Sequence, residues 1–291
     1  MADINLWIAA LEIGCFFALI GLTLYLVVVG ADFFNFATGP YAMAAALFAG
    51  FATASWGMSI YVAVLVGILI GIVSGMLTEI VVVKPIQKRA GGAELPALVV
   101  VTATLFGIQQ LAGTLFGRTP RSVEQFLPLG DLTIGDVVID RGSLSIILTT
   151  VVIFVGVIAW LNMSTVGQLL RAVGDNNEAA RMIGINVNVV RLWAFGIAGA
   201  IAAIAGLVFA AKSGVQFTSG LSWTLTGFLA LVIGGLGRPW APLIGGLALG
   251  FIQVFSSYYY GATGASIAIF LVALVFFAVR PEGLFQRKVR V

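Results

Sequence analysis

The chain has 291 residues, of which 60% are hydrophobic and 9% are charged, and its formal net charge is +3. Soluble domains carry about 25% charged residues, so this composition excludes a globular domain that covers itself with polar surface in water. The sequence contains no histidine and one cysteine, which excludes His-based triads, His/Cys metal sites and an intrachain disulfide. Its 36 glycines suit a helical membrane protein, in which small residues let helices pack closely.

Nine long apolar runs predict membrane-spanning helices, since one span takes roughly 20 residues. The expected fold class is an all-α polytopic membrane protein with about eight or nine transmembrane helices, and residues 1–291 are expected to form a single transmembrane domain. The first run is expected to remain as a permanent span, because no basic segment precedes it. The runs cover residues 7–29, 41–57, 59–83, 96–117, 143–162, 190–211, 221–236, 240–260 and 264–280.

The positive charges predict how these spans are oriented. With the N-terminus outside, eleven of the 15 Lys and Arg residues fall in inner connections and four in outer ones, as the positive-inside rule requires. The inner residues are Lys84, Lys88, Arg89, Arg171, Arg181, Arg191, Arg238, Arg280, Arg287, Lys288 and Arg290, and the outer residues are Arg118, Arg121, Arg141 and Lys212. We therefore expect the N-terminus outside and the C-terminus inside.

Two segments, 31–40 and 234–242, interrupt the apolar pattern. The first contains Asp32, Asn35, Thr38, Gly39 and Pro40. Backbone freed from a helix at membrane depth is tolerated where it faces protein or a water-filled cavity, so both breaks are candidates for lining a transport path. The alternative is that both are ordinary turns between helices, because Gly, Pro, Asn and Asp are turn formers.

Polar side chains inside spans are costly in lipid and are therefore candidates for a path as well. Two carboxylates, Glu12 and Glu79, fall well within runs, unless Glu79 simply lies near the inner surface. The alternative for each polar residue is a hydrogen bond between helices, which is worth roughly 1 kcal/mol. The candidate path residues are Asn35, Thr38, Gly39, Thr102, Thr104, Gln109 and Gln110.

The glycine spacing predicts close contacts between helices. Gly67, Gly71 and Gly75 fall on one helix face, and Gly246 and Gly250 repeat the four-residue spacing. We interpret both sets as helix–helix contacts inside one subunit, with a dimer interface as the alternative for one of them.

Two polar segments lie between the runs. Residues 118–142 predict an outer loop with a small hairpin, where a soluble binding protein could dock, although a plain connector is the alternative. Residues 163–190 predict a loop on the cytoplasmic side that contains a short amphipathic helix. Asp175 or Asn176 is its expected N-cap, and Gly184 is expected to stop it. A loop of this length with an apolar face requires a partner surface.

The cytoplasmic loop contains Glu178-Ala179-Ala180 and then Gly184, which matches the E-A-A-x-x-x-G signature of bacterial ABC importer permeases without its I-x-L-P ending. The other matching segments are Phe34-Asn-Phe-Ala-x-Gly39, Lys84-Pro85, Ser164-Thr-x-Gly167, Arg171-Ala-x-Gly-Asp-Asn176, Gly184-Ile-Asn186, Leu231-x-Ile-Gly-Gly-Leu-Gly237, Ile244-Gly-Gly-x-x-Leu-Gly250 and Arg280-Pro-x-Gly-Leu284. Over nearly its whole length, the chain resembles the permeases of the branched-chain amino acid (Liv-type) ABC transporter family.

The resemblance implies a type II-like ABC importer permease of the bacterial inner membrane. It implies a second homologous permease, two cytoplasmic ATPase subunits and a soluble substrate-binding protein as partners, and no nucleic acid. ATP and Mg²⁺ would bind on the ATPase subunits, so this chain would carry no cofactor, metal or catalytic residue, in agreement with the lack of a G-x-x-x-x-G-K-[ST] loop. The residues implied to couple to the ATPase are Asp175, Glu178, Ala179, Ala180, Arg181, Met182, Ile183 and Gly184.

One position departs from the family. Thr38 stands where the family motif N-F-A-H-G usually has its histidine. If that histidine contacts the solute, the chain would carry a related amide or carboxylate solute instead of leucine, isoleucine or valine. The alternative is a structural hydrogen bond that threonine also makes.

Three other classes of protein compete with this interpretation. A secondary transporter or channel would usually place a coupling charge deep in a span and would not need the cytoplasmic helix. An intramembrane hydrolase lacks a histidine for a Ser/His pair, and Asp32 is the only aspartate near a span that a two-aspartate site could use. A structural scaffold would leave the segment from Glu178 to Gly184 unexplained.

Overall fold

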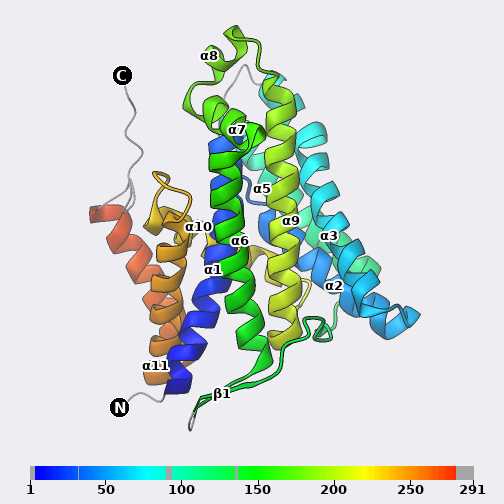
Figure 1. Ribbon diagram of the computed structural model, residues 1–291, viewed down its shortest axis with the longest axis vertical. Coiled ribbons are helices and arrows are strands. Elements are labelled where there is room, and N and C mark those ends of the chain that lie inside the picture. Colours follow the sequence, from blue (N-terminus) through cyan, green and yellow to red (C-terminus); the bar gives the residue numbers. More distant parts are fainter. Residues whose placement is uncertain (1–3, 32, 90–93, 135–136, 280–291) are drawn as a thin grey trace.

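The computed structural model describes residues 4–31, 33–89, 94–134 and 137–279, which are almost entirely helical (Figure 1). The elements are α1 (Ile4–Ala31), α2 (Thr38–Trp56), α3 (Ile60–Leu77), the π-helix η1 (Thr78–Val83), α4 (Lys84–Arg89), α5 (Glu94–Phe116), β1 (Leu132–Ile134), β2 (Val137–Ile139), α6 (Arg141–Met163), α7 (Thr165–Asp175), α8 (Asn177–Met182), α9 (Val187–Ser213), α10 (Ser219–Gly234) and α11 (Ala241–Val279). The predicted residues from Arg280 to Arg290 lie outside this description, as does Asp32.

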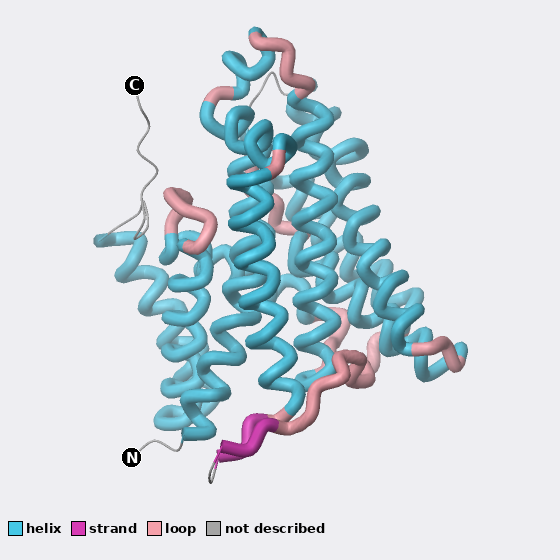
Figure 2. The backbone as a smooth tube through the Cα atoms, viewed as in Figure 1, coloured by secondary structure: helices cyan, strands magenta, loops and turns pink. Residues whose placement is uncertain are grey.

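The long helices run side by side between two ends of the molecule (Figure 1). The short helices α7 and α8 lie at one end, and the start of α1 and the β1–β2 hairpin lie at the other. Some loop segments lie between the two ends of the bundle, alongside the long helices, and others lie at its ends (Figure 2). The predicted hairpin is confirmed, with Leu132 paired to Ile139 in an antiparallel register.

Every predicted apolar run coincides with a helix. Among the described residues, six helices are long and apolar enough to cross a membrane: α1, α3 continued through α4, α5, α6, α9 and α11. Gly261 has φ 73° inside α11, which divides that helix at the boundary predicted between two runs. The structure therefore confirms an all-α polytopic membrane protein, whereas the predicted number of spans stays a prediction.

Helix α1 forms the centre of the bundle. Its residues from Gly14 to Ala31 are all buried, and it packs against α6, α7, α9, α10 and α11. An apolar sequence suits a span that faces lipid and a span that faces protein equally well. The packing around α1 thus shows that this first run is a core helix of the subunit.

The chain repeats one arrangement with inverted direction. The helices α1, α2 and α3, and likewise α9, α10 and α11, form a long helix, a shorter helix after a break, and a glycine-containing helix. Helix α3 packs on α9, and α11 packs on α1, so each triplet places its third helix on the first helix of the other. Since α1 and α9 start at opposite ends of the molecule (Figure 1), the two triplets form an inverted repeat, an arrangement typical of transporters.

The breaks inside this repeat differ from those predicted. The first predicted break is present, because the described residues 33–37 between α1 and α2 are not helical. The break that mirrors it is 214–218, between α9 and α10, where Gly214 has φ 72°. Segment 234–242 is instead the turn between α10 and α11, with Gly235 at φ 90°, in agreement with the alternative considered for it.

Glycine residues allow close packing where the third helix of one triplet contacts the first helix of the other. A Cβ added at Gly71 of α3 would overlap with the carbonyl oxygen of Gly199 on α9, and one added at Gly199 would overlap with the carbonyl oxygen of Gly71. Gly246 and Gly250 of α11 meet α1 in the same way, at Ala18 and Gly14. Both predicted glycine sets therefore form contacts inside the subunit.

A leucine at Gly71 is expected to destabilise the protein. The added Cβ would lie 2.6 Å from the Cβ of Ala203, so α3 and α9 must separate, and overpacking of this kind costs about 1–3 kcal/mol. Thermal unfolding in detergent measures the effect. Gly156→Leu is the matched control, because nothing lies within 4 Å of a Cβ added there. Equal unfolding temperatures for the two variants would contradict the importance of this contact.

Candidate functional site

The starts of α2 and α10 meet inside the bundle. The Gly39 N–H donates to Thr224 Oγ1 at 3.1 Å, and the Thr224 hydroxyl in turn donates to the carbonyl of Phe36 at 3.0 Å. A Cβ at Gly39 would overlap with the carbonyl oxygen of Gly220, so the two backbones touch. Gly39 has no side chain, so the two helix starts can approach closely. The Thr224 side chain then forms hydrogen bonds with backbone groups at the break that lack partners within a helix.

Three of the predicted path residues lie at this crossing. Asn35 and Thr38 are fully buried, and Gly39 is buried with them. Asn35 Oδ1 accepts from the Ala37 N–H at 3.0 Å, and Thr38 Oγ1 lies 3.4 Å from the carbonyl of Asn35. Their partners belong to the same chain, which favours the hydrogen-bonding alternative for Thr38. These residues hold the starts of the two shorter helices in place.

The four predicted residues of α5 have different surroundings. Thr102 and Gln110 are exposed, whereas Thr104 donates to the carbonyl of Val100 at 2.8 Å. Gln109 is 6% exposed, and its Oε1 has no hydrogen-bond partner. The structure therefore does not place the α5 residues and the buried residues of the α2 break on one common surface.

The exposed side of α5 carries a stripe of four residues, of which three are polar and one is aromatic. Thr102, Phe106, Gln110 and Thr114 are exposed at four-residue spacing. Residues four apart lie on one face of a helix, so these side chains line up along α5. The Thr114 hydroxyl donates to the carbonyl of Leu111 at 2.9 Å. The amide of Gln110 is exposed, and lipid tails offer it no hydrogen bonds, so at membrane depth it requires water or a partner chain.

The predicted cytoplasmic loop folds into two helices. Asn176 caps α8, since its Oδ1 accepts from the Ala179 N–H at 2.9 Å, and Gly184 follows α8 with φ 86°. Helix α7 before it is amphipathic, with Leu170 and Val173 buried. The sequence predicted one helix with Asp175 or Asn176 as its cap, and Asn176 is the cap of α8. Helix α7 was not predicted, although the spacing of Leu170 and Val173 is a helical signal.

The residues predicted to couple to an ATPase gather around α8. Ala180 is buried at 3% exposure, whereas Met182 and Ile183 are 81% and 76% exposed. The other residues of the set divide by exposure: Asp175, Arg181 and Gly184 are exposed, Ala179 is half-buried, and the side chain of Glu178 lies outside the described part of the structure. The loop thus presents two adjacent large apolar side chains to its surroundings.

Helix α7 is seated on the end of the central helix α1. A Cβ at Gly174 would overlap with the carbonyl oxygen of Val29, and a Cβ at Gly30 would lie 3.0 Å from the Cδ1 of Leu170. The loop is therefore in direct contact with the last turn of α1, immediately before the break that leads to α2.

A charged network lies at the opposite end of the molecule. Lys212 Nζ of α9 is 2.5 Å from Glu12 Oε2 of α1 and 2.8 Å from Asp140 Oδ2, and Ser143 Oγ donates to Glu12 Oε2 at 2.7 Å. Partial burial would raise the pKa of Asp140, but hydrogen bonds from Lys212 and Ser143 lower that pKa to about 2. In the described ranges, no three His, Cys, Asp or Glu side chains are grouped as ligands for a metal ion.

The segment before the hairpin crosses the second break. Arg121 and Val215 exchange backbone hydrogen bonds of 2.9 and 2.7 Å, which joins the 117–131 segment to the connection between α9 and α10. The Arg121 guanidinium lies 5.1 Å from the ring centre of Phe51 on α2. This segment therefore contacts elements of both halves of the inverted repeat.

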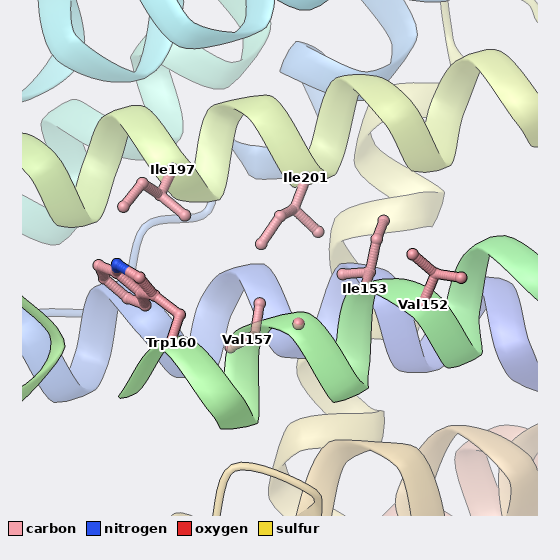
Figure 3. Close-up of a pocket in the computed structure, with 7 residues that line it drawn as sticks. Val152, Ile153, Val157, Trp160, Ile197 and Ile201 are labelled. Carbon is pink, nitrogen blue, oxygen red and sulfur yellow. The ribbon is translucent and has the colours of Figure 1, made fainter. Parts of the chain in front are cut away.

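An apolar groove of about 380 Å³ runs between α6 and α9 (Figure 3). Val157 and Trp160 of α6 face Ile197 and Ile201 of α9 across it. Gly156 also lines the groove. The groove lies between two helices that are long and apolar enough to cross a membrane, and the indole N–H is its one polar side-chain group. A polar solute would find almost no hydrogen-bond partner there, so this groove is not a candidate path.

The inverted repeat, the two broken helices and the structured loop at one end define a polytopic membrane protein of the transporter type. Residues 8–279 match the family described as "Branched-chain amino acid transport system / permease component". The chain belongs to this family.

Individual relatives carry related names. The chain is 24% identical to the branched-chain amino acid permease protein BraD of Pseudomonas aeruginosa, over 68% of this chain and 66% of that protein. It is 30% identical to LivH of Escherichia coli over 44% and 42%, and 35% identical to the ribose import permease protein RbsC of Haemophilus influenzae over 33% and 32%. The chain thus spans from one third to two thirds of the length of these curated relatives.

A solved structure shares the fold. The chain is similar to one from "PsaBC from Streptococcus pneumoniae in complex with Fab", with a TM-score of 0.52 and 10% identity over 94% of this chain and 91% of that one. At this identity the likeness establishes the arrangement of the helices alone. With its apolar helices and its family, the chain is a multi-pass protein of the bacterial inner membrane.

Proposed function

We propose that this chain is the transmembrane permease subunit of an ATP-binding cassette importer. The observation that carries the proposal is the pair Met182 and Ile183, which lies exposed after a capped helix at one end of the molecule. Large apolar side chains at such exposure mark a surface that a partner protein covers. Family membership supports an ATPase subunit as that partner.

The proposed assembly contains two permeases, two cytoplasmic ATPase subunits and a soluble substrate-binding protein. ATP and Mg²⁺ bind on the ATPase subunits, and this chain carries no catalytic residue. The binding protein docks at the end that holds the hairpin, opposite the α7–α8 loop (Figure 1). The solute is a branched-chain amino acid or a related small amide or carboxylate, and the ribose permeases among the relatives extend the range of candidates to sugars.

The translocation path runs along the exposed side of α5. The exposed amide of Gln110 lies on this side, and lipid offers it no hydrogen-bond partner, whereas water or a solute between two permeases does. The stripe carries no charge, so it suits a path that binds the solute weakly. Selectivity then lies with the binding protein.

A secondary transporter is the competing function, and the buried carboxylates argue against it. Glu12 is paired with Lys212, and Glu79 is paired with Arg191, so neither is available as a free coupling group. Each pair joins two helices of the bundle or a helix to η1.

Co-purification tests the proposal. The tagged chain is extracted from native membranes in mild detergent, and mass spectrometry quantifies the ATPase subunits, second permease and binding protein recovered with it. The variant M182D/I183D is expected to lose the ATPase subunits and retain the second permease, because two charges are buried at the contact. Leu132→Asp on β1, at the opposite end, is the control for the ATPase contact and is expected to retain the ATPase subunits, whatever it does to recovery of the binding protein. Recovery of the unaltered chain alone would overturn the proposal.

A further inference from the structure

A buried ion pair joins the start of α9 to η1, which continues α3. Arg191 is 8% exposed and Glu79 is 2% exposed. Arg191 Nε lies 2.9 Å from Glu79 Oε1, and Arg191 Nη2 donates to Glu79 Oε2 at 3.2 Å. The guanidinium therefore contacts both carboxylate oxygens, although only the Nη2 contact is a hydrogen bond and the Nε–H has no hydrogen-bond partner. The Nη2 hydrogen bond is directional as well as close.

Hydrogen bonds continue from this ion pair to α2. Thr78, next to Glu79, accepts from the Tyr41 hydroxyl at 2.7 Å and donates to the carbonyl of Ser74 at 2.8 Å. Tyr41 is fully buried in the first turn of α2. Thr78 and Glu79 both belong to the π-helix η1, a rare geometry that occurs often at functional sites.

The chain of contacts ends in the break before α2. The Tyr41 hydroxyl accepts from Asn35 Nδ2 at 3.2 Å, and Asn35 Oδ1 accepts from the backbone N–H of Ala37. Side chains from α9, η1 and α2 thus connect the cytoplasmic loop to residues 33–37. The loop is joined to α9 through Asn186, whose side chain caps that helix.

The polar contacts of Arg191, Glu79 and Tyr41 are not the arrangement that stability alone would favour. Well-packed apolar residues hold buried helices together as well as or better than an ion pair does, because the pair loses its hydration. Gly75, which packs against the carbonyl of Phe195, already holds α3 close to α9 one turn away. Directional bonds add a fixed rotation of α9 relative to η1, and hence of η1 relative to α2.

We propose that Glu79, Arg191 and Tyr41 are positioning residues of the transport cycle. They transmit the position of the α7–α8 loop to the broken start of α2, in addition to the direct seat of α7 on α1. The inference rests on the proposed function, since the ATPase supplies the movement of the loop. Transmission requires that ATP binding on the partner favour one position of the loop over another, because a ligand shifts an equilibrium only by its differential affinity for the two states.

Spin labels in the complete transporter test the inference. One label is placed by V166C on α7 and another, in a separate sample, by F36C in the break, and each spectrum is compared with and without ATP and vanadate. Both labels are expected to respond in the otherwise unaltered protein. In Tyr41→Phe and in Arg191→Lys, the response at position 36 is expected to fall severalfold while that at position 166 persists. Tyr258→Phe, which removes an exposed hydroxyl elsewhere, is the matched control.

The outcomes separate the two proposals. No response at position 166 in the unaltered protein would overturn the proposed function itself. A response at 166 without one at 36, or an undiminished response at 36 in both Tyr41→Phe and Arg191→Lys, would overturn the positioning role and leave the proposed function standing. Because Tyr41→Phe removes one oxygen and retains the ring, it keeps the packing of α2, so a folded protein is expected for the measurement.

Discussion

Replacing Glu178 and Arg181 with alanine is expected to abolish ATP-driven solute uptake while the transporter still assembles at its other contacts. Both residues lie on α8, and neither is its N-cap, which is Asn176. Because alanine favours the helical conformation, the loop is expected to keep its structure. The change removes charged groups from the surface proposed to meet the ATPase. Uptake of radiolabelled leucine into proteoliposomes and simultaneous ATP hydrolysis measure the effect, with the unaltered transporter as reference.

The control for this experiment removes charge at the same end of the molecule. Lys88 and Arg89 are exposed at the end of α4, and their replacement with alanine is expected to leave uptake unchanged. Full uptake by the Glu178 and Arg181 variant would contradict the coupling role. Loss of uptake with retained binding-protein docking would support it, because the two ends of the molecule would then be affected separately.

Several features of the fold follow from local sequence signals. The apolar runs predict the helices, Asn176 predicts the cap of α8, and the polar stretch around Asn35 predicts the first break, because each signal acts within a few residues. The second break, 214–218, was missed, since a single glycine at Gly214 with polar neighbours looks like any helix end. Only the structure shows that this break mirrors the first one, because it places the start of α10 beside Gly39.

The contacts between distant residues could not be predicted. Arg191 and Lys212 were counted among the loop charges that set the orientation, yet each is paired with a buried carboxylate more than 100 residues away. Sequence proximity carries no information about such a pair. In the same way, hydropathy identified α1 as a span but gave no sign that it is the buried centre of the subunit, because lipid and protein interior favour the same residues.

The variant Arg191→Leu is expected to lower the free energy of unfolding by about 3–5 kcal/mol, since it leaves the Glu79 carboxylate buried without its partner. Chemical unfolding in mixed micelles measures this loss. The double variant E79L/R191L is expected to recover most of it, because two apolar side chains in contact replace the pair without an uncompensated charge. Equal losses in the single and double variants would show that the pair itself is not the cause.

The double variant E79L/R191L also distinguishes a role of the ion pair in stability from a role in orienting α9 and η1. If E79L/R191L unfolds like the unaltered protein but takes up solute poorly for each ATP hydrolysed, the ion pair serves the geometry of α9 and η1 and not the strength of their contact. A stable double variant with full uptake would assign Glu79 and Arg191 to the fold alone. The direct seat of α7 on Val29 of α1 would then be the contact that connects the cytoplasmic loop to the broken helix.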